Sequence, residues 1–157
     1  MIAALLLLAA PTTLYADGHW ASFDRGTNCA ATTRAERITT DRADQAHAGF
    51  TFDKAGPSST TGGARHGQLA VRLGRPLRPG GTVMLTIGDQ PFLLAASDRF
   101  AWSRGPAQEA AIIAAARSAD GMRIEGRSPG GGRFVDRYLL AGAPGAIDAA
   151  AACSAKR

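Results

Sequence analysis

A chain of 157 residues, with 20% charged residues and a formal net charge of +5, is long enough to form one globular domain with a buried core. The positive charge comes from sixteen arginines and two lysines, which are scattered rather than gathered into a basic run. Few aromatic residues lie among the arginines, so the composition argues against a nucleic-acid-binding protein.

The N-terminal segment has the layout of a secretory signal peptide. The apolar run 2–10 is broken by Pro11 and is followed by the small-residue site Leu14-Tyr15-Ala16. The run has about half of the roughly 20 apolar residues that a membrane-spanning helix needs. We therefore expect residues 1–16 to be removed on export, residues 17–157 to form a single domain, and no membrane span to remain.

The two cysteines, Cys29 and Cys153, lie far apart in the sequence. Because exported proteins fold in an oxidising compartment, we expect a disulfide that ties the first strand of the domain to its last helix. The alternative is a nucleophilic Cys29 that works with His19, His47 or His66, although no recognisable spacing relates these residues.

Short alternations of apolar and polar residues, separated by glycine and proline, predict β-strands in the first part of the domain. Strands are expected at 48–52, 68–73, 81–88 and 90–97. The last of these is apolar on both faces, which is typical of a buried central strand. Residues 54–67 are expected to form an exposed loop, residues 75–81 a turn, and residues 88–90 the turn of a hairpin.

Two helices are predicted, at about 106–119 and 144–155, and each begins with a proline in its first turn. The apolar stripe of the first is expected to comprise Ala110, Ile113 and Ala116, and that of the second Ala146, Ala149 or Ala150, and Cys153. The sequence between them, 121–140, predicts a hairpin. The predicted fold class is α+β, a mostly antiparallel β-sheet or sandwich with two helices on one side or end.

The predicted hairpin carries several arginines on one face. Alternation along its strands places together Arg123, Arg127, Arg133 and Arg137, with Glu125 among them. Guanidinium groups bind phosphates and carboxylates through paired hydrogen bonds. We therefore treat these four arginines as a candidate anion-binding face, with an ordinary solvated surface as the alternative.

Other candidate sites give weaker signals. Gly126-Arg127-Ser128-Pro129-Gly130 fits the spacing of a serine-hydrolase elbow, but Pro129 has no N–H to donate to an oxyanion, so a hairpin turn is expected there. Asp136 lies on the expected buried face and is expected to pair with an arginine or to cap a backbone group. The histidine spacings match no metal signature, and no phosphate-binding glycine loop is present. We expect no catalytic residue, no metal and no cofactor.

The C-terminal half resembles a known family. It contains a helix ending at Ala115-Ala116-Arg117, a strand beginning at Gly121-Met122, a glycine-rich turn, the pattern Asp136-x-Tyr138-x-Leu140-x-Gly142-Ala143, and a last helix that runs to Cys153. Together with Trp20 and Cys29, this order resembles the invasion-associated locus B family of exported alphaproteobacterial proteins. The resemblance implies a β-rich envelope protein without known enzymatic chemistry, in a family sometimes linked to host-cell invasion.

The sequence therefore predicts a non-enzymatic periplasmic, cell-envelope or secreted protein that acts by binding a protein or an anionic envelope component. One alternative is a periplasmic enzyme whose site combines Asp136, the histidines and the arginine-bearing face. The other is a lysozyme-inhibitor-like module, which the positive charge shared with most lysozymes disfavours.

Overall fold

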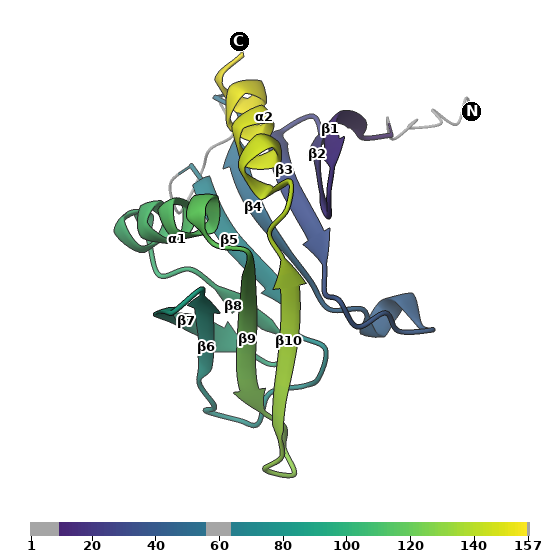
Figure 1. The fold of residues 1–157 in the computed structure, drawn as a ribbon, viewed down its shortest axis with the longest axis vertical. Helices are drawn as coiled ribbons and strands as arrows, with labels where there is room; N and C mark the ends of the chain where they lie inside the picture. Colours follow the sequence, from purple (N-terminus) through teal and green to yellow (C-terminus); the bar gives the residue numbers. More distant parts are fainter. Residues whose placement is uncertain (1–9, 56–63, 157) are drawn as a thin grey trace, which may run out of the picture.

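In the computed structural model, the described part of the chain comprises residues 10–55 and 64–156. It forms a ten-stranded antiparallel sheet with two α-helices (Figure 1), which confirms the predicted α+β class. The strands are β1 (Thr12–Asp17), β2 (Trp20–Asp24), β3 (Asn28–Arg34), β4 (His47–Asp53), β5 (His66–Arg72), β6 (Val83–Ile87), β7 (Gln90–Ser97), β8 (Phe100–Trp102), β9 (Gly121–Arg127) and β10 (Arg133–Leu139). The helices are α1 (Pro106–Ser118), α2 (Ala143–Ala155) and the short 3-10 helix η1 (Arg42–Asp44).

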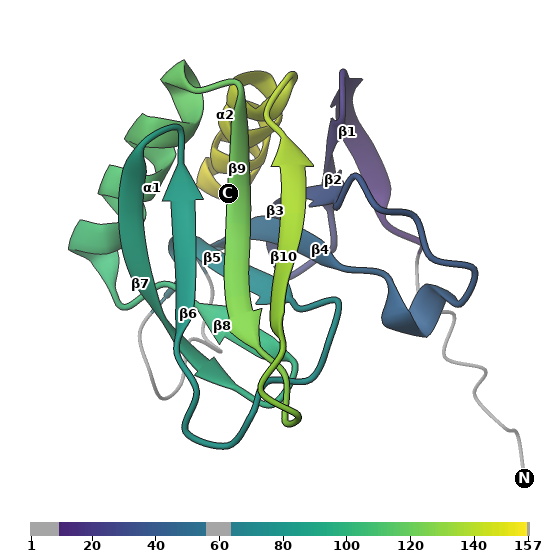
Figure 2. The same ribbon diagram turned by 60° about the horizontal axis from the view of Figure 1, so that its bottom comes forward.

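The sheet bends sharply where β7 changes its partner. The strand order is β1-β2-β3-β4-β5-β8-β7-β6-β9-β10. The first part of β7, up to Leu94, pairs with β6, and the remainder, from Ala95, pairs with β8. As a result, β6, β9 and β10 stand in front of β4 and β5 and cross them (Figure 2). The two halves of the sheet thus face each other across the core.

The core lies between the two halves of the sheet and under the helices. Phe50 and Leu69 from the first half, Leu85 and Ile124 from the second, and Ile147 from α2 are all fully buried. Both phenylalanines of β4 point inward, as their spacing predicts, because alternate residues of a strand share a face.

Hydrogen bonds join the end of β10 to the beginning of the chain. The indole Nε1 of Trp20 donates to the carbonyl of Leu139 at 2.9 Å. The N–H of Glu36 donates to the carbonyl of Arg137 at 2.8 Å. The two ends of the strand order therefore lie close together, and the sheet curls around its core.

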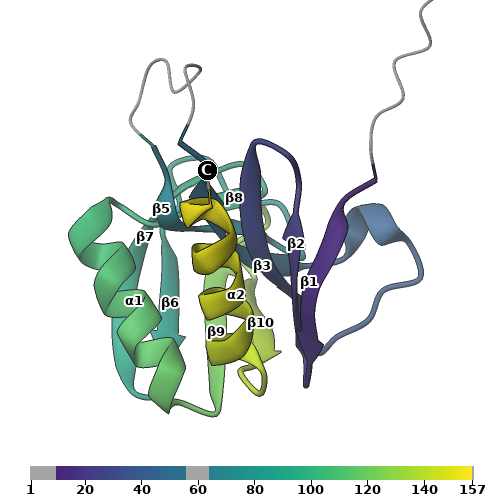
Figure 3. The ribbon, with the colours of Figure 1, turned by 90° about the horizontal axis from the view of Figure 1, so that it is seen from above.

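Both helices cover the same end of the molecule (Figure 3), where α2 packs on β1 to β4 and α1 packs mainly on β5. The prediction for α2 is confirmed, since Ala146, Ala150 and Cys153 are buried. The stripe predicted for α1 is wrong in part: Ala110 is exposed and Ile113 only half-buried, and the buried side chains are Ile112, Ala115 and Ala116. Because α1 is rich in alanine, its apolar pattern does not single out one face.

The expected burial of 90–97 on both faces is also wrong. The strand β7 is central in the strand order, yet only Leu94 is buried. Where β7 leaves one partner for the other, the carbonyl of Leu93 accepts hydrogen bonds from the side chains of Arg104 and Gln108. Side chains from the segment before α1 and from its first turn thus replace a neighbouring strand.

The predicted signal peptide falls partly within the described residues. Residues 2–9 of the apolar run lie outside them, whereas the predicted cleavage site after Ala16 lies within β1. A side chain at Gly145 of α2 would collide with the Tyr15 ring, so this glycine allows β1 to approach the helix. Two strands precede Cys29, so the prediction that it lies in the first strand is wrong, and it belongs to β3.

Candidate functional site

The β9–β10 hairpin brings the four predicted arginines onto one face. Arg133 pairs with Arg127 and Arg137 with Arg123, and residues directly opposite each other in an antiparallel pair share a face. The other face of the hairpin carries the buried side chains of Ile124 and Phe134. We call the outward set the arginine face: Arg123, Glu125, Arg127, Arg133, Val135 and Arg137.

Glu125 is the one acidic side chain on the arginine face. Its carboxylate accepts hydrogen bonds from Arg133 at 2.7 Å and from Arg123 at 2.9 Å. The hydrogen bond from Arg133 is the main cause that lowers the pKa of Glu125, and the bond from Arg123 adds to it against the effect of burial. Because one carboxylate serves two guanidinium groups, the arginine face keeps a surplus of positive charge.

A depression of about 230 Å³ opens at one end of the arginine face. Three arginines line it, Arg127 and Arg133 from the hairpin and Arg78 from the loop before β6, together with Thr82, Met84, Glu125 and Gly126. The backbone N–H of Arg78 donates to the carbonyl of Arg127 at 2.9 Å, which holds the loop beside the hairpin. Arg78 was not predictable as part of this site, because it lies in a turn where no periodicity assigns it to a face.

Arg127 is held in place without an acidic partner among the residues that the structure describes. Its Nη1 donates to the carbonyl of Gly131 in the hairpin turn at 3.1 Å. No carboxylate within 4.0 Å pairs with Arg78 in the same described part of the chain. The depression thus presents guanidinium groups whose charge is available to an anion.

A second depression, of about 540 Å³, lies over the outer side of α1 and has a different character. Most of its lining is apolar, from Pro106, Ala110, Ile113 and neighbouring alanines. His66, Glu109 and Arg117 contribute its polar groups, and in the described residues no hydrogen bond joins these three. It is an apolar hollow rather than a set of convergent titratable groups.

Asp136 caps a backbone group, as one of the two sequence expectations has it. Its carboxylate accepts the N–H of Gly74, just after β5, at 2.8 Å. Burial is the main cause that raises the pKa of Asp136, and the bond from Gly74 and the charges of Arg37, Arg75 and Arg99 oppose it. This carboxyl connects β10 to the loop after β5.

Arg99 and Tyr138 complete the surroundings of Asp136. Arg99 donates to the carbonyl of Gly74 at 3.1 Å and pairs with Asp44 of η1 at 2.9 Å. The Tyr138 hydroxyl has no hydrogen-bond partner in the described residues, and burial together with the nearby Asp136 charge raises its pKa well above the usual range. A hydroxyl that holds its proton this firmly is a poor general acid, and near neutral pH it has no phenolate form that could act as a general base.

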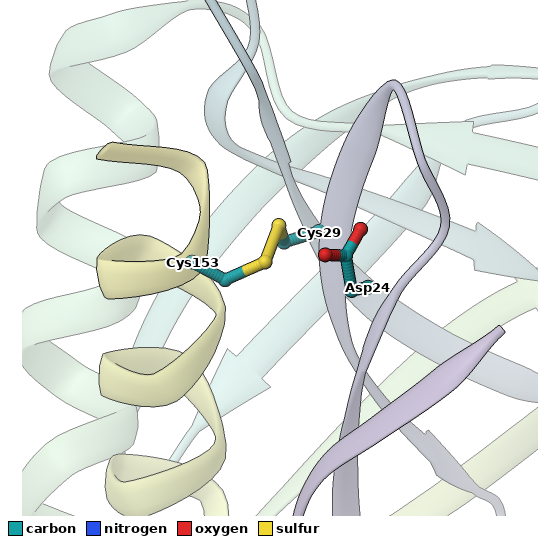
Figure 4. Close-up of side chains that lie close together, drawn as sticks. All are labelled: Asp24, Cys29 and Cys153. Atoms are coloured by element: carbon teal, nitrogen blue, oxygen red, sulfur yellow. A yellow bond between two sulfur atoms is a disulfide. The ribbon is translucent and has the colours of Figure 1, made fainter. Parts of the chain in front are cut away.

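Cys29 and Cys153 form the predicted disulfide, with Cα atoms 6.2 Å apart. The carboxylate of Asp24 lies beside the two sulfur atoms (Figure 4), and the three groups come within 4.8 Å of one another. Sulfur atoms bonded to each other are not thiolate ligands, and Asp24 pairs with Lys54 at 2.8 Å. The cluster is therefore a structural cross-link beside an ion pair.

The predicted histidine sites do not come together. His19 lies between β1 and β2, His47 begins β4 and His66 begins β5. In the described residues none of them belongs to a group of metal-ligating side chains, and the ring of His47 contacts the carbonyl of Gln45 at 3.2 Å.

Ser128 lies in the hairpin turn that the sequence predicts. Its N–H donates to the carbonyl of Gly132 at 2.9 Å, and its carbonyl accepts the N–H of Gly131 at 2.8 Å. The strand β10 follows the turn, whereas a hydrolase elbow leads into a helix. The backbone N–H and carbonyl of Ser128 thus form the hydrogen bonds that close the hairpin turn.

Comparisons of the chain with protein-family models, with curated proteins and with solved structures give no match. The geometry of the site therefore carries the functional argument.

Proposed function

We propose that this chain is a non-enzymatic, exported protein of the bacterial cell envelope that acts by binding, with the arginine face as its contact surface for an anionic partner. The single observation that carries the proposal is the register of the β9–β10 hairpin, which collects four arginines around one carboxylate. A surface with surplus guanidinium groups attracts anions and orients them through paired hydrogen bonds.

Three features support the exported location. The N-terminal sequence has the layout of a signal peptide. The bond between Cys29 and Cys153 is of a kind that persists in oxidising compartments such as the periplasm. The resemblance of the C-terminal half to the invasion-associated locus B family points to the same compartment. Within the described residues, no helix is both long enough and apolar enough to cross a membrane.

Binding fits the arginine face better than catalysis does. Acid–base catalysis needs a titratable group that can reach a substrate. The carboxylate of Asp136 already accepts the Gly74 N–H, and the carboxylate of Glu125 is shared between Arg123 and Arg133. The arginines that remain can hold an anion but are too basic to exchange protons with it.

The proposal is tested with inorganic polyphosphate as a soluble anionic probe. The double variant Arg127→Gln/Arg137→Gln removes one charge from each side of Glu125 and leaves its two ion pairs in place. We expect calorimetry at low salt to show binding that weakens as salt is added and that the double variant loses. Arg25→Gln/Arg42→Gln, at exposed positions in the turn between β2 and β3 and in η1, removes the same number of charges and is the matched control. Equal binding by all three proteins, or no binding at low salt, would contradict the proposal.

A further inference from the structure

A row of three apolar side chains and Glu125 crosses the sheet on the same side as the arginine face. In the register of the four strands, Val135 of β10 pairs with Glu125 of β9, Glu125 with Met84 of β6, and Met84 with Leu93 of β7. Opposed residues share a face, so these side chains lie side by side on the outer surface. The front strands of Figure 2 carry this surface.

Leu93, at one end of this row, is exposed to solvent, whereas Met84 and Val135 are half-buried. Leu93 is 40% exposed, and Leu139, which also points outward from β10, is 37% exposed. They are two of the five large apolar side chains that are exposed in the described residues, the others being Leu14, Ile38 and Phe100. Exposed apolar side chains beside positive charges that have no acidic partner are typical of an interaction site.

Arginines flank the row on both sides. The pair Arg127 and Arg133 lies along the strands in one direction, and the pair Arg123 and Arg137 lies in the other. Glu125, within the row, pairs with one arginine on each side, Arg133 and Arg123, so Arg127 and Arg137 remain without an acidic partner in the described residues. Arg127 and Arg137 thus present two separated positive charges beside the apolar side chains of the row, an arrangement that suits a surface with many regularly spaced negative charges.

We infer that this outer surface of β10, β9, β6 and β7 docks on the anionic headgroups of a lipid membrane. The guanidinium groups bind lipid phosphates, while Leu93 and Met84 enter the boundary between headgroups and acyl chains. Arginine suits this place because its stem lies along apolar surface while its head reaches phosphate. The depression lined by Arg78, Arg127 and Arg133 accommodates one phosphate group. The inference rests on the proposed function and names the chemistry of its partner.

The test measures sedimentation of the full chain with phosphatidylglycerol–phosphatidylcholine vesicles and with pure phosphatidylcholine vesicles. We expect binding to the anionic vesicles alone, with a partition coefficient that falls about fivefold for each of Arg127→Gln and Arg137→Gln. Leu93→Ser should also lower it, because it removes the apolar contact. Arg25→Gln and Ile38→Ser, at exposed positions outside the surface, are the matched controls.

The polyphosphate probe separates failure of this inference from failure of the proposed function. Leu93→Ser should weaken vesicle binding and leave polyphosphate binding unchanged. If polyphosphate binds and anionic vesicles do not, or if Leu93→Ser binds vesicles as well as the unchanged chain does, membrane docking is overturned and anion binding stands. If neither probe binds, both proposals fail.

Discussion

The carboxylate of Asp136 and the backbone of Gly74 are in direct contact: one oxygen accepts the Gly74 N–H at 2.8 Å, and a Cβ on Gly74 would lie 2.6 Å from the other. A side chain at Gly74 would therefore push the carboxylate out of place. We expect Gly74→Ala to lower the free energy of unfolding by about 1–3 kcal/mol, as overpacking typically does.

A double-mutant cycle measures this contact. In an Asp136→Ala background the space is open, so Gly74→Ala should cost markedly less than it does in the unchanged chain. Urea denaturation of the four proteins gives the coupling. If the two substitutions lower the free energy of unfolding additively, the collision between a side chain at Gly74 and the Asp136 carboxylate is not the cause of the destabilisation.

Asp136 should also shape the pH dependence of stability. Burial raises the pKa of this carboxyl above its usual 3.8 in the folded protein. The unfolded chain therefore loses the proton first as pH rises, and the free energy of unfolding decreases between the unfolded and folded pKa values. Asp136→Asn keeps an oxygen for the Gly74 N–H and has no charge to bury. It should be the more stable protein at neutral pH, and the difference should shrink on acidification.

Urea denaturation from about pH 3 to about pH 7 tests this expectation. Asp89→Asn, in the exposed turn between β6 and β7, is a control that makes the same change of formal charge. A difference between Asp136→Asn and the unchanged chain that grows on acidification would contradict the assigned direction of the pKa shift.

The strands and helices that were predictable from sequence are those with strong local patterns. Alternation in 48–52 and 121–140, and a proline in the first turn of each helix, identify β4, the β9–β10 hairpin, α1 and α2. The bend in β7 was not predictable, because it depends on two partner strands and on the side chains of Arg104 and Gln108. The pattern of apolar and polar residues within a strand does not predict which other strands pair with it.

The candidate site divides in the same way. Alternation along the strands is enough to predict that the four arginines share one face. Which arginine lies opposite which depends on the register of β9 and β10, and this register depends on the length of the turn. Arg78 and Met84 join the site through the loop before β6 and through β6 itself. Such contacts between distant segments follow from the complete fold and have no signal in either segment alone.

The disulfide should contribute much of the stability. It closes a loop between residues separated by 124 positions, which restricts the unfolded chain by up to about 4–5 kcal/mol in the chain-entropy model. We expect Cys29→Ala/Cys153→Ala to unfold at much lower urea concentration than the unchanged chain. The unreduced protein, once denatured, should show no free thiol on labelling. If the urea midpoint of this variant equals that of the unchanged chain, packing of α2 on the sheet is sufficient to stabilise the fold without the disulfide.

Processing at the predicted site should leave a folded domain. Cleavage after Ala16 removes all of β1 except Asp17. Because β1 is an edge strand whose side chains are mostly exposed, its loss uncovers little of the core. The bond from the His19 N–H to the Ala141 carbonyl, at 2.9 Å, remains. We expect a chain that begins at Asp17 to fold with its disulfide intact, less stable by about 1 kcal/mol through loss of Tyr15 from its place beside Gly145.

N-terminal sequencing of the protein from a periplasmic fraction checks the cleavage site, and thermal denaturation of the two chain lengths checks the stability. Intact Met1 in the cytosolic fraction would contradict export. A chain from Asp17 that fails to fold would instead show that β1 is needed in the mature protein.

The hairpin turn allows a sharp comparison between Ser128 and the glycines that follow it. The Ser128 backbone closes the turn, whereas its hydroxyl makes only a long bond, 3.3 Å, to the carbonyl of Gly132. Ser128→Ala should therefore change the free energy of unfolding by less than about 0.5 kcal/mol. Gly131 has a φ of +87°, so Gly131→Ala should cost about 1–2 kcal/mol, because side chains disfavour that conformation. Gly130 is the control, since a Cβ there meets open space and its φ is not positive; Gly130→Ala should be nearly neutral.

A fluorophosphonate probe completes the test of Ser128. A reactive serine needs an oxyanion donor from the next residue, and Pro129 has no N–H. The purified protein should therefore remain unlabelled, and Ser128→Ala should bind polyphosphate as the unchanged chain does. Stoichiometric labelling that Ser128→Ala abolishes would identify Ser128 as a nucleophile and replace the binding function proposed for this hairpin with catalysis.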